Sequence, residues 1–151
     1  MKITRLSQSD FKSLMNEKNI NDSTVDNINN VFFICINSTK LIHSIPYFKE
    51  KHDNVINLYF DDVLRSGPKE EELWFTRGHP FFDRTAMSKE QGEELVNFIS
   101  KIPNNSEVYV YCAKGQSRSG AVEDFLMNRP VSSGSNSHVY NTLKVTRDAR
   151  L

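Results

Sequence analysis

The chain has 151 residues, of which 38% are apolar and 25% are charged, and its 19 basic and 19 acidic side chains give a formal net charge of zero. These values are typical of a globular protein and predict a single domain over residues 1–151. A neutral chain has no long-range positive field that would recruit nucleic acid or an anionic membrane. Any anion must therefore be bound by a local arrangement of groups.

The sequence shows no membrane-spanning or secretory signal. The longest apolar run, Val31 to Ile36, is far too short to cross a bilayer, and the N-terminus MKITRLSQSD lacks the apolar stretch of a signal peptide. Two cysteines, Cys35 and Cys112, do not make a disulfide framework. We therefore expect a cytoplasmic protein with free thiols and no membrane partner.

The first sixty residues predict three strands and two helices. Residues 2–6 have the character of a short strand, and Ser7 is in position to cap the helix that follows. The continuous apolar run at residues 31–36 is typical of a strand buried on both faces. Residues 41–51 are expected to form a short helix, and residues 54–60 a further strand that ends before Asp61 and Asp62.

The middle of the chain contains a long connection. Residues 63–87 have no clean period, and long loops in compact domains are usually functional or mobile. Ser88 and Gln91 have the spacing of a capping box, and the apolar stripe that follows stops before Pro103. Residues 107–111 then predict another strand.

The last part of the chain predicts two more helices. The first is marked by the apolar positions Ala121, Val122, Phe125 and Leu126; residues 129–137 are expected to be a flexible turn, and residues 138–145 a last short helix. Strands that alternate with helices favour an α/β fold with a central, mainly parallel sheet of about four or five strands flanked by helices.

The segment VYVYCAKGQSRSG, residues 108–120, carries the strongest chemical signal. A strand leads into Cys112, five residues intervene, and Arg118 opens a helix. Ligands of open α/β sheets bind beyond the carboxyl ends of strands, where a helix N-terminus and a nest of backbone N–H groups attract anions. Gly115 lets the loop curl tightly, and the planar guanidinium of Arg118 can hold two phosphate oxygens.

The same surroundings favour the thiolate form of Cys112, which would face a bound phosphorus atom. Ser119 could donate a hydrogen bond to that thiolate and ease its departure. A cysteine six positions before an arginine also arises by chance, and a buried cysteine at a strand end is usually a packing residue. Here the glycine, the Ser-Gly pair and the helix start all stand where anion binding requires them, which favours function.

This segment resembles the signature of the protein tyrosine and dual-specificity phosphatase superfamily, Cys-x5-Arg followed by Ser or Thr, matched by Cys112, Gly115, Arg118 and Ser119. LYFDD at residues 58–62 looks like a segment of the small phosphatase-like proteins of bacteria and phages. The resemblance implies hydrolysis of a phosphomonoester through a cysteinyl-phosphate, without a metal. It also implies that the loop residues hold the phosphate, namely Ala113, Lys114, Gly115, Gln116, Ser117 and Arg118.

The chain differs from the family at the residue before the cysteine, where Tyr111 replaces the usual His. Such phosphatases take the proton for the leaving group from an aspartic acid on a separate loop. Asp62, the second Asp of the Phe-Asp-Asp segment, is the first candidate, and its neighbour Asp61 could substitute for it. Asp83 is the rival, because it lies 29 residues before Cys112, close to the spacing usual in the family.

Several alternatives remain open at this stage. The substrate could be a phosphorylated protein or a small phosphorylated molecule, and nucleic acid is expected only as a phosphorylated substrate. A catalytically weak phosphate-binding module would keep the same loop, whereas Arg118 and Ser119 argue against a sulfurtransferase. Cys35 is expected in the core, with a redox pairing to Cys112 as the alternative. The histidines show no metal-ligand spacing with the cysteines, so no metal or other cofactor is expected.

Overall fold

The computed structural model describes residues 1–66 and 84–150. They form an α/β fold around a four-stranded parallel sheet in the order β1-β4-β2-β3. The strands are β1 (Lys2–Ser7), β2 (Val31–Asn37), β3 (Val55–Tyr59) and β4 (Glu107–Cys112). The helices are α1 (Gln8–Glu17), α3 (Lys89–Ser100), α4 (Ser117–Leu126) and α5 (Ser137–Asp148). The predicted fold class is confirmed, with four strands.

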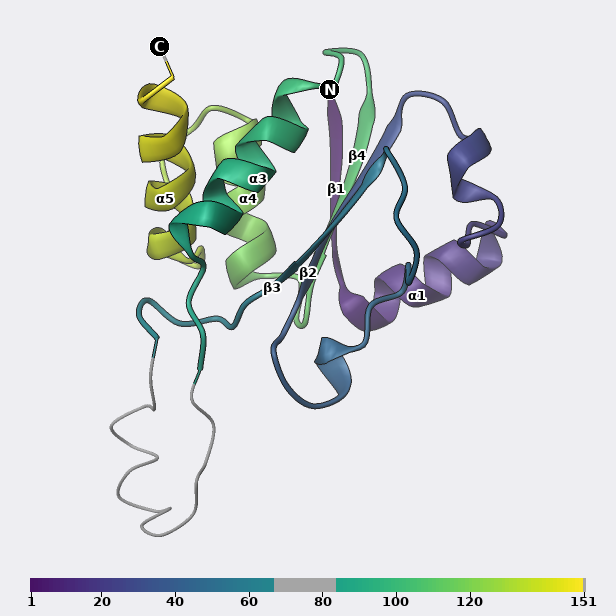
Figure 1. Ribbon diagram of the computed structural model, residues 1–151, viewed down its shortest axis with the longest axis horizontal. Helices are drawn as coiled ribbons and strands as arrows, with labels where there is room; N and C mark the ends of the chain where they lie inside the picture. The colour runs from purple at the N-terminus through teal and green to yellow at the C-terminus, as the bar shows by residue number, and fades with distance from the viewer. Residues whose placement is uncertain (67–83, 151) are drawn as a thin grey trace, which may run out of the picture.

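Helices cover both faces of the sheet (Figure 1). Helix α1 lies on one face, and α3, α4 and α5 lie on the other. Successive side chains of a strand point to opposite faces, so each central strand supplies both cores. In β4, Val108, Val110 and Cys112 belong to the core beneath α3, α4 and α5. Tyr109 and Tyr111 belong to the core on the α1 face.

The predicted helix starts are confirmed by their capping groups. The Ser7 side chain accepts a hydrogen bond from the backbone N–H of Asp10, three residues into α1. At α3, Ser88 and Gln91 form a complete capping box, in which each side chain bonds to the other's backbone N–H. Within the described ranges, the chain has no helix that is long and apolar enough to span a membrane.

Three sequence expectations are corrected. Residues 41–51 contain only a single 3-10 turn, Ile42–Ser44, because Pro46 lacks an N–H and keeps Ile45 extended at ψ 112°. The last helix is longer than expected and runs to Asp148. The supposed flexible turn at 129–137 is tied to the protein by a buried carboxylate, as described below.

Candidate active site

The cysteine loop lies at the carboxyl end of β4, a central strand, and leads directly into α4. Cys112 is almost fully buried, and its Sγ lies 3.1 Å from the hydroxyl Oγ of Ser119. The backbone N–H of Ser119 also points to this sulfur, at an N–S distance of 3.4 Å. The first turn of α4 therefore places a backbone N–H and a hydroxyl group against the sulfur of Cys112.

Glycine is the residue type that fits position 115 of the loop. Its φ is +69°, in the left-handed region that favours glycine. A Cβ there would lie 2.4 Å from the backbone nitrogen of Ser7 and 2.5 Å from the carbonyl carbon of Leu6. The loop thus packs against the end of β1 so closely that there is no room for a Cβ atom at position 115.

Arg118 is held from two neighbouring strands. Its Nη1 donates to the carbonyl oxygen of Phe60, after β3, at 2.7 Å, and to the hydroxyl of Ser38, after β2, at 3.2 Å. The side chain is buried, with 4% exposed. Its Nε is also buried, and within residues 1–66 and 84–150 it meets no acceptor. The guanidinium is therefore fixed in place with one buried donor left open.

The rest of the loop is held from the β1 side. The carbonyl oxygen of Ala113 accepts the backbone N–H of Gln8 at 3.4 Å, and that of Gln116 accepts Nη1 of Arg5, also at 3.4 Å. The side chains of Lys114 and Gln116 are exposed. Sequence reasoning missed the roles of Arg5 and Gln8, because these contacts become visible only once β1 is paired with β4.

Asp62, the first candidate for the general acid, lies beside the loop. It is exposed, and its Oδ1 accepts the hydroxyl of Ser117 at 2.7 Å and the side-chain Nδ2 of Asn136 at 2.9 Å. Ser117 is the residue before Arg118, so the structure brings this carboxyl to the cysteine loop. Sequence reasoning assigned Asn136 no role at this site. The rival acid, Asp83, lies outside the described residues.

Asp61 has a different environment from its neighbour. Its two oxygens accept the N–H of Thr39 at 3.0 Å, the hydroxyl of Thr39 at 2.7 Å and the N–H of Thr85 at 2.8 Å. Burial works against the charged carboxylate, yet these hydrogen bonds and the charge of Arg118 outweigh burial and hold the pKa of Asp61 below its ordinary value. Asp61 therefore stays charged and links its own segment to those that contain Thr39 and Thr85.

Tyr111 and Cys35 lie behind the loop, on the α1 face of the sheet. The hydroxyl of Tyr111 donates to Oδ1 of Asn37, a buried residue at the end of β2, and burial raises the pKa of this tyrosine. Burial likewise raises the pKa of the Cys35 thiol. Because Cys35 and Cys112 point into opposite cores, they cannot form a disulfide without backbone movement. The redox pairing considered from the sequence is therefore not supported.

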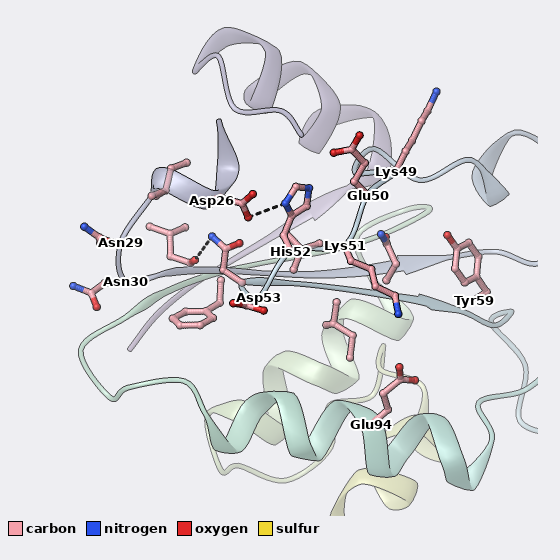
Figure 2. A pocket seen from close by; sticks show the side chains of 17 residues that line it. Asp26, Asn29, Asn30, Lys49, Glu50, Lys51, His52, Asp53, Tyr59 and Glu94 are labelled. Carbon is pink, nitrogen blue, oxygen red and sulfur yellow. Dashed lines mark hydrogen bonds and ion pairs between the residues drawn. The ribbon is translucent and has the colours of Figure 1, made fainter. Parts of the chain in front are cut away.

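A second polar cluster lies away from the loop, beside an open hollow of about 960 Å³ along β3 (Figure 2). One potential ligand atom each from Asp22, Glu50 and His52 lies within 4.8 Å of the others, a spacing that would suit a metal ion. However, the two ring nitrogens of His52 already face carboxylate oxygens of Asp22 and Asp26, at 2.7 and 2.8 Å. An imidazolium that donates from both nitrogens has no lone pair for a metal.

The structure thus brings together Cys112, Ser119, Arg118 and Asp62, the residues that the sequence singled out for chemistry, around one short loop. Such a set can hold an anion, supply a nucleophilic sulfur and exchange a proton. Comparisons with known protein families, with curated proteins and with solved structures found no match for this chain.

Proposed function

We propose that the protein is a cysteine-dependent phosphatase that hydrolyses phosphomonoesters through a cysteinyl-phosphate. The observation that carries the proposal is the buried Nε of Arg118, a donor without an acceptor in the described residues, in the same loop as a buried cysteine at a helix N-terminus. A buried donor without a partner costs about 1–3 kcal/mol. A phosphoryl oxygen held by the loop would supply the acceptor and recover that free energy.

The chemistry follows from the placement of these groups. The Cys112 thiolate attacks phosphorus and the bond to the ester oxygen breaks, while Asp62 gives its proton to the leaving oxygen. Arg118 and the backbone N–H groups of the loop stabilise the charge on the phosphoryl oxygens. Water then attacks the cysteinyl-phosphate, Asp62 takes up a proton, and the phosphorus–sulfur bond breaks. The hydrogen bond from Ser119 stabilises the departing thiolate.

The resemblance of the loop to the tyrosine and dual-specificity phosphatases supports the same reaction. A phosphorylated protein and a small phosphorylated molecule both remain candidate substrates. We also propose a reducing, cytosolic environment, since the reaction needs Cys112 as a free thiol and both cysteines are free.

The test is hydrolysis of p-nitrophenyl phosphate by the wild-type protein and by Cys112→Ser. We expect Cys112→Ser to lower kcat by on the order of 10³-fold or more, because the attacking sulfur is lost. Cys35→Ala is the matched control, because it removes the other thiol from the opposite face of the sheet. It should leave the rate within about threefold of the wild type.

Asp62→Asn tests the general acid. Its effect should be about 10²-fold or more on phenyl phosphate, a poor leaving group, and much smaller on p-nitrophenyl phosphate. No turnover by folded wild-type protein that still binds vanadate would contradict the phosphatase and favour the phosphate-binding module.

A further inference from the structure

The segment between α4 and α5 is anchored by one buried carboxylate. Asp124 of α4 is 1% exposed. Its oxygens accept Nε of Arg129 at 2.6 Å, the N–H and hydroxyl of Ser132 at 2.9 and 3.1 Å, and the hydroxyl of Ser135 at 2.8 Å. These bonds outweigh the effect of burial and hold the pKa of Asp124 below its ordinary value. The segment therefore has a fixed course, and it leads to Asn136.

Asn136 joins the phosphate loop to the candidate acid. It is buried, with 4% exposed, and its backbone N–H donates to the carbonyl oxygen of Ser117 at 3.0 Å. Its side-chain Nδ2 donates to Oδ1 of Asp62 at 2.9 Å and to the carbonyl oxygen of Val63 at 3.3 Å. Its Oδ1 accepts the N–H of Val139 at 3.1 Å, which caps α5.

These contacts fix which way the amide faces. The N–H of Val139 needs an acceptor, so Oδ1 must face α5 and Nδ2 must face Asp62. The hydroxyl of Ser117 donates to the same Oδ1 of Asp62. An oxygen that accepts two hydrogen bonds is a poor place for a proton, so in the acid form of Asp62 the proton belongs on Oδ2.

We propose that Asn136 is a positioning residue that orients the carboxyl of Asp62 so that Oδ2 carries the proton to the leaving oxygen. The inference rests on the proposed phosphatase function. In the first step, Oδ2–H gives its proton to the ester oxygen as the phosphorus–oxygen bond breaks. In the second, Oδ2 takes a proton from the attacking water. Asn136 and Ser117 keep their bonds to Oδ1 throughout, so the carboxyl does not have to turn between the steps.

The test uses Asn136→Ser and Asn136→Asp with two substrates. Both replacements keep an oxygen that can cap α5, and both lose the amide donor to Asp62. We expect kcat for phenyl phosphate to fall about 10- to 100-fold, whereas kcat for p-nitrophenyl phosphate, whose leaving group needs little proton transfer, changes less than about threefold. Asp62→Asn should show the same dependence on the leaving group, and Asn136→Ser added to it should cause almost no further loss.

Ser88→Ala is the matched control. It removes the cap of α3. The capping hydrogen bonds of Ser88 are made with Gln91 and do not involve Asp62. It should lower the melting temperature without any dependence on the leaving group. An equal fall on both substrates in the Asn136 variants, or additivity with Asp62→Asn, would overturn the positioning role while leaving the phosphatase intact. Absence of turnover in the wild type would instead overturn both proposals.

Discussion

Two clusters of charged side chains differ in whether their buried nitrogen atoms have a hydrogen-bond partner. Beside the hollow, both ring nitrogens of His52 meet carboxylates, one from Asp26, which Figure 2 shows, and one from Asp22. At the end of β4, Arg118 is buried, but its Nε meets no acceptor within the described parts of the chain. The histidine of the first cluster is paired at both ring nitrogens, whereas the arginine at the cysteine loop keeps one buried donor unused.

Two other buried atoms, Oδ1 of Asn54 beside the hollow and Oγ of Ser106, also meet no partner among the described residues, so the open Nε of Arg118 points to a ligand because it lies at the cysteine loop. A buried donor that stays open lowers the stability of the fold, and such groups are rare in folded proteins. A histidine that is paired at both nitrogens is explained by the segments that it joins. We therefore expect changes at the cysteine loop to act mainly on turnover and changes around His52 to act mainly on stability.

Among the substitutions that compare these two clusters, the largest effect is expected for Gly115→Ala. The new Cβ would lie within 2.4 to 2.8 Å of the backbone of Leu6 and Ser7, which cannot move away without opening β1 from the loop. We expect kcat for p-nitrophenyl phosphate to fall on the order of 10²-fold, since the loop N–H groups lose their alignment. Gly134→Ala is the control, because a Cβ there meets nothing within 4 Å. Similar rates for the two variants would contradict the tight curl of the loop.

The fold and the loop could be predicted because their signals are local. The strand, the glycine and the arginine of the loop follow one another in the sequence, and Ser88 stands three residues from its capping partner. By contrast, Asn136 reaches Asp62, and Tyr111 reaches Asn37, across 74 residues of sequence in both cases. Such pairs depend on the strand order, in which β4 lies between β1 and β2, and no local pattern encodes it.

Residues 129–137 are a second case in which the local sequence does not predict the structure. Their Ser, Gly and Asn content is typical of a mobile turn when only the local sequence is considered. What holds them is a carboxylate on α4, Asp124, whose acidic side chain would ordinarily be expected in solvent. A buried acid with several donors around it is a feature of tertiary packing, and composition alone cannot reveal it.

The neighbours Asp61 and Asp62 provide a second comparison between a residue that acts on stability and one that acts on turnover. We expect Asp61 to be the first and Asp62 the second. Asp61→Asn places an amide against donors from Thr39 and Thr85, so we expect a loss of about 2 kcal/mol in the free energy of unfolding. Because the pKa of Asp61 is held low, its stabilisation is present above about pH 4 and is lost as the pH falls through the folded-state pKa.

The measurement is urea unfolding of the wild type, Asp61→Asn and Asp62→Asn at pH 7 and at pH 3.5. The deficit of Asp61→Asn should shrink at the lower pH. Asp62→Asn, whose carboxyl is exposed, should unfold close to the wild type at pH 7 while losing activity on phenyl phosphate. The opposite assignment, with Asp61→Asn stable and Asp62→Asn unstable, would mean that the two carboxylates exchange these roles.

The smallest effect is expected at His52, whose two ring nitrogens both face carboxylates. Burial works to lower the pKa of His52, but its hydrogen bonds to Asp22 and Asp26 and their negative charges outweigh burial and raise it. A raised pKa means that the stabilisation is complete below the ordinary histidine value of 6.5 and is lost as the pH rises through the folded-state pKa.

His52→Gln should therefore lower the free energy of unfolding by about 1 kcal/mol at pH 6 and by less at pH 9, with turnover of p-nitrophenyl phosphate unchanged. Urea unfolding at both pH values measures this difference, and His138→Gln tests whether the loss of any histidine has the same effect. A deficit that grows with pH would mean that His52 is neutral in the fold. One of its nitrogens would then be an acceptor facing a carboxylate, and the histidine would no longer be paired at both nitrogens without a bound cation.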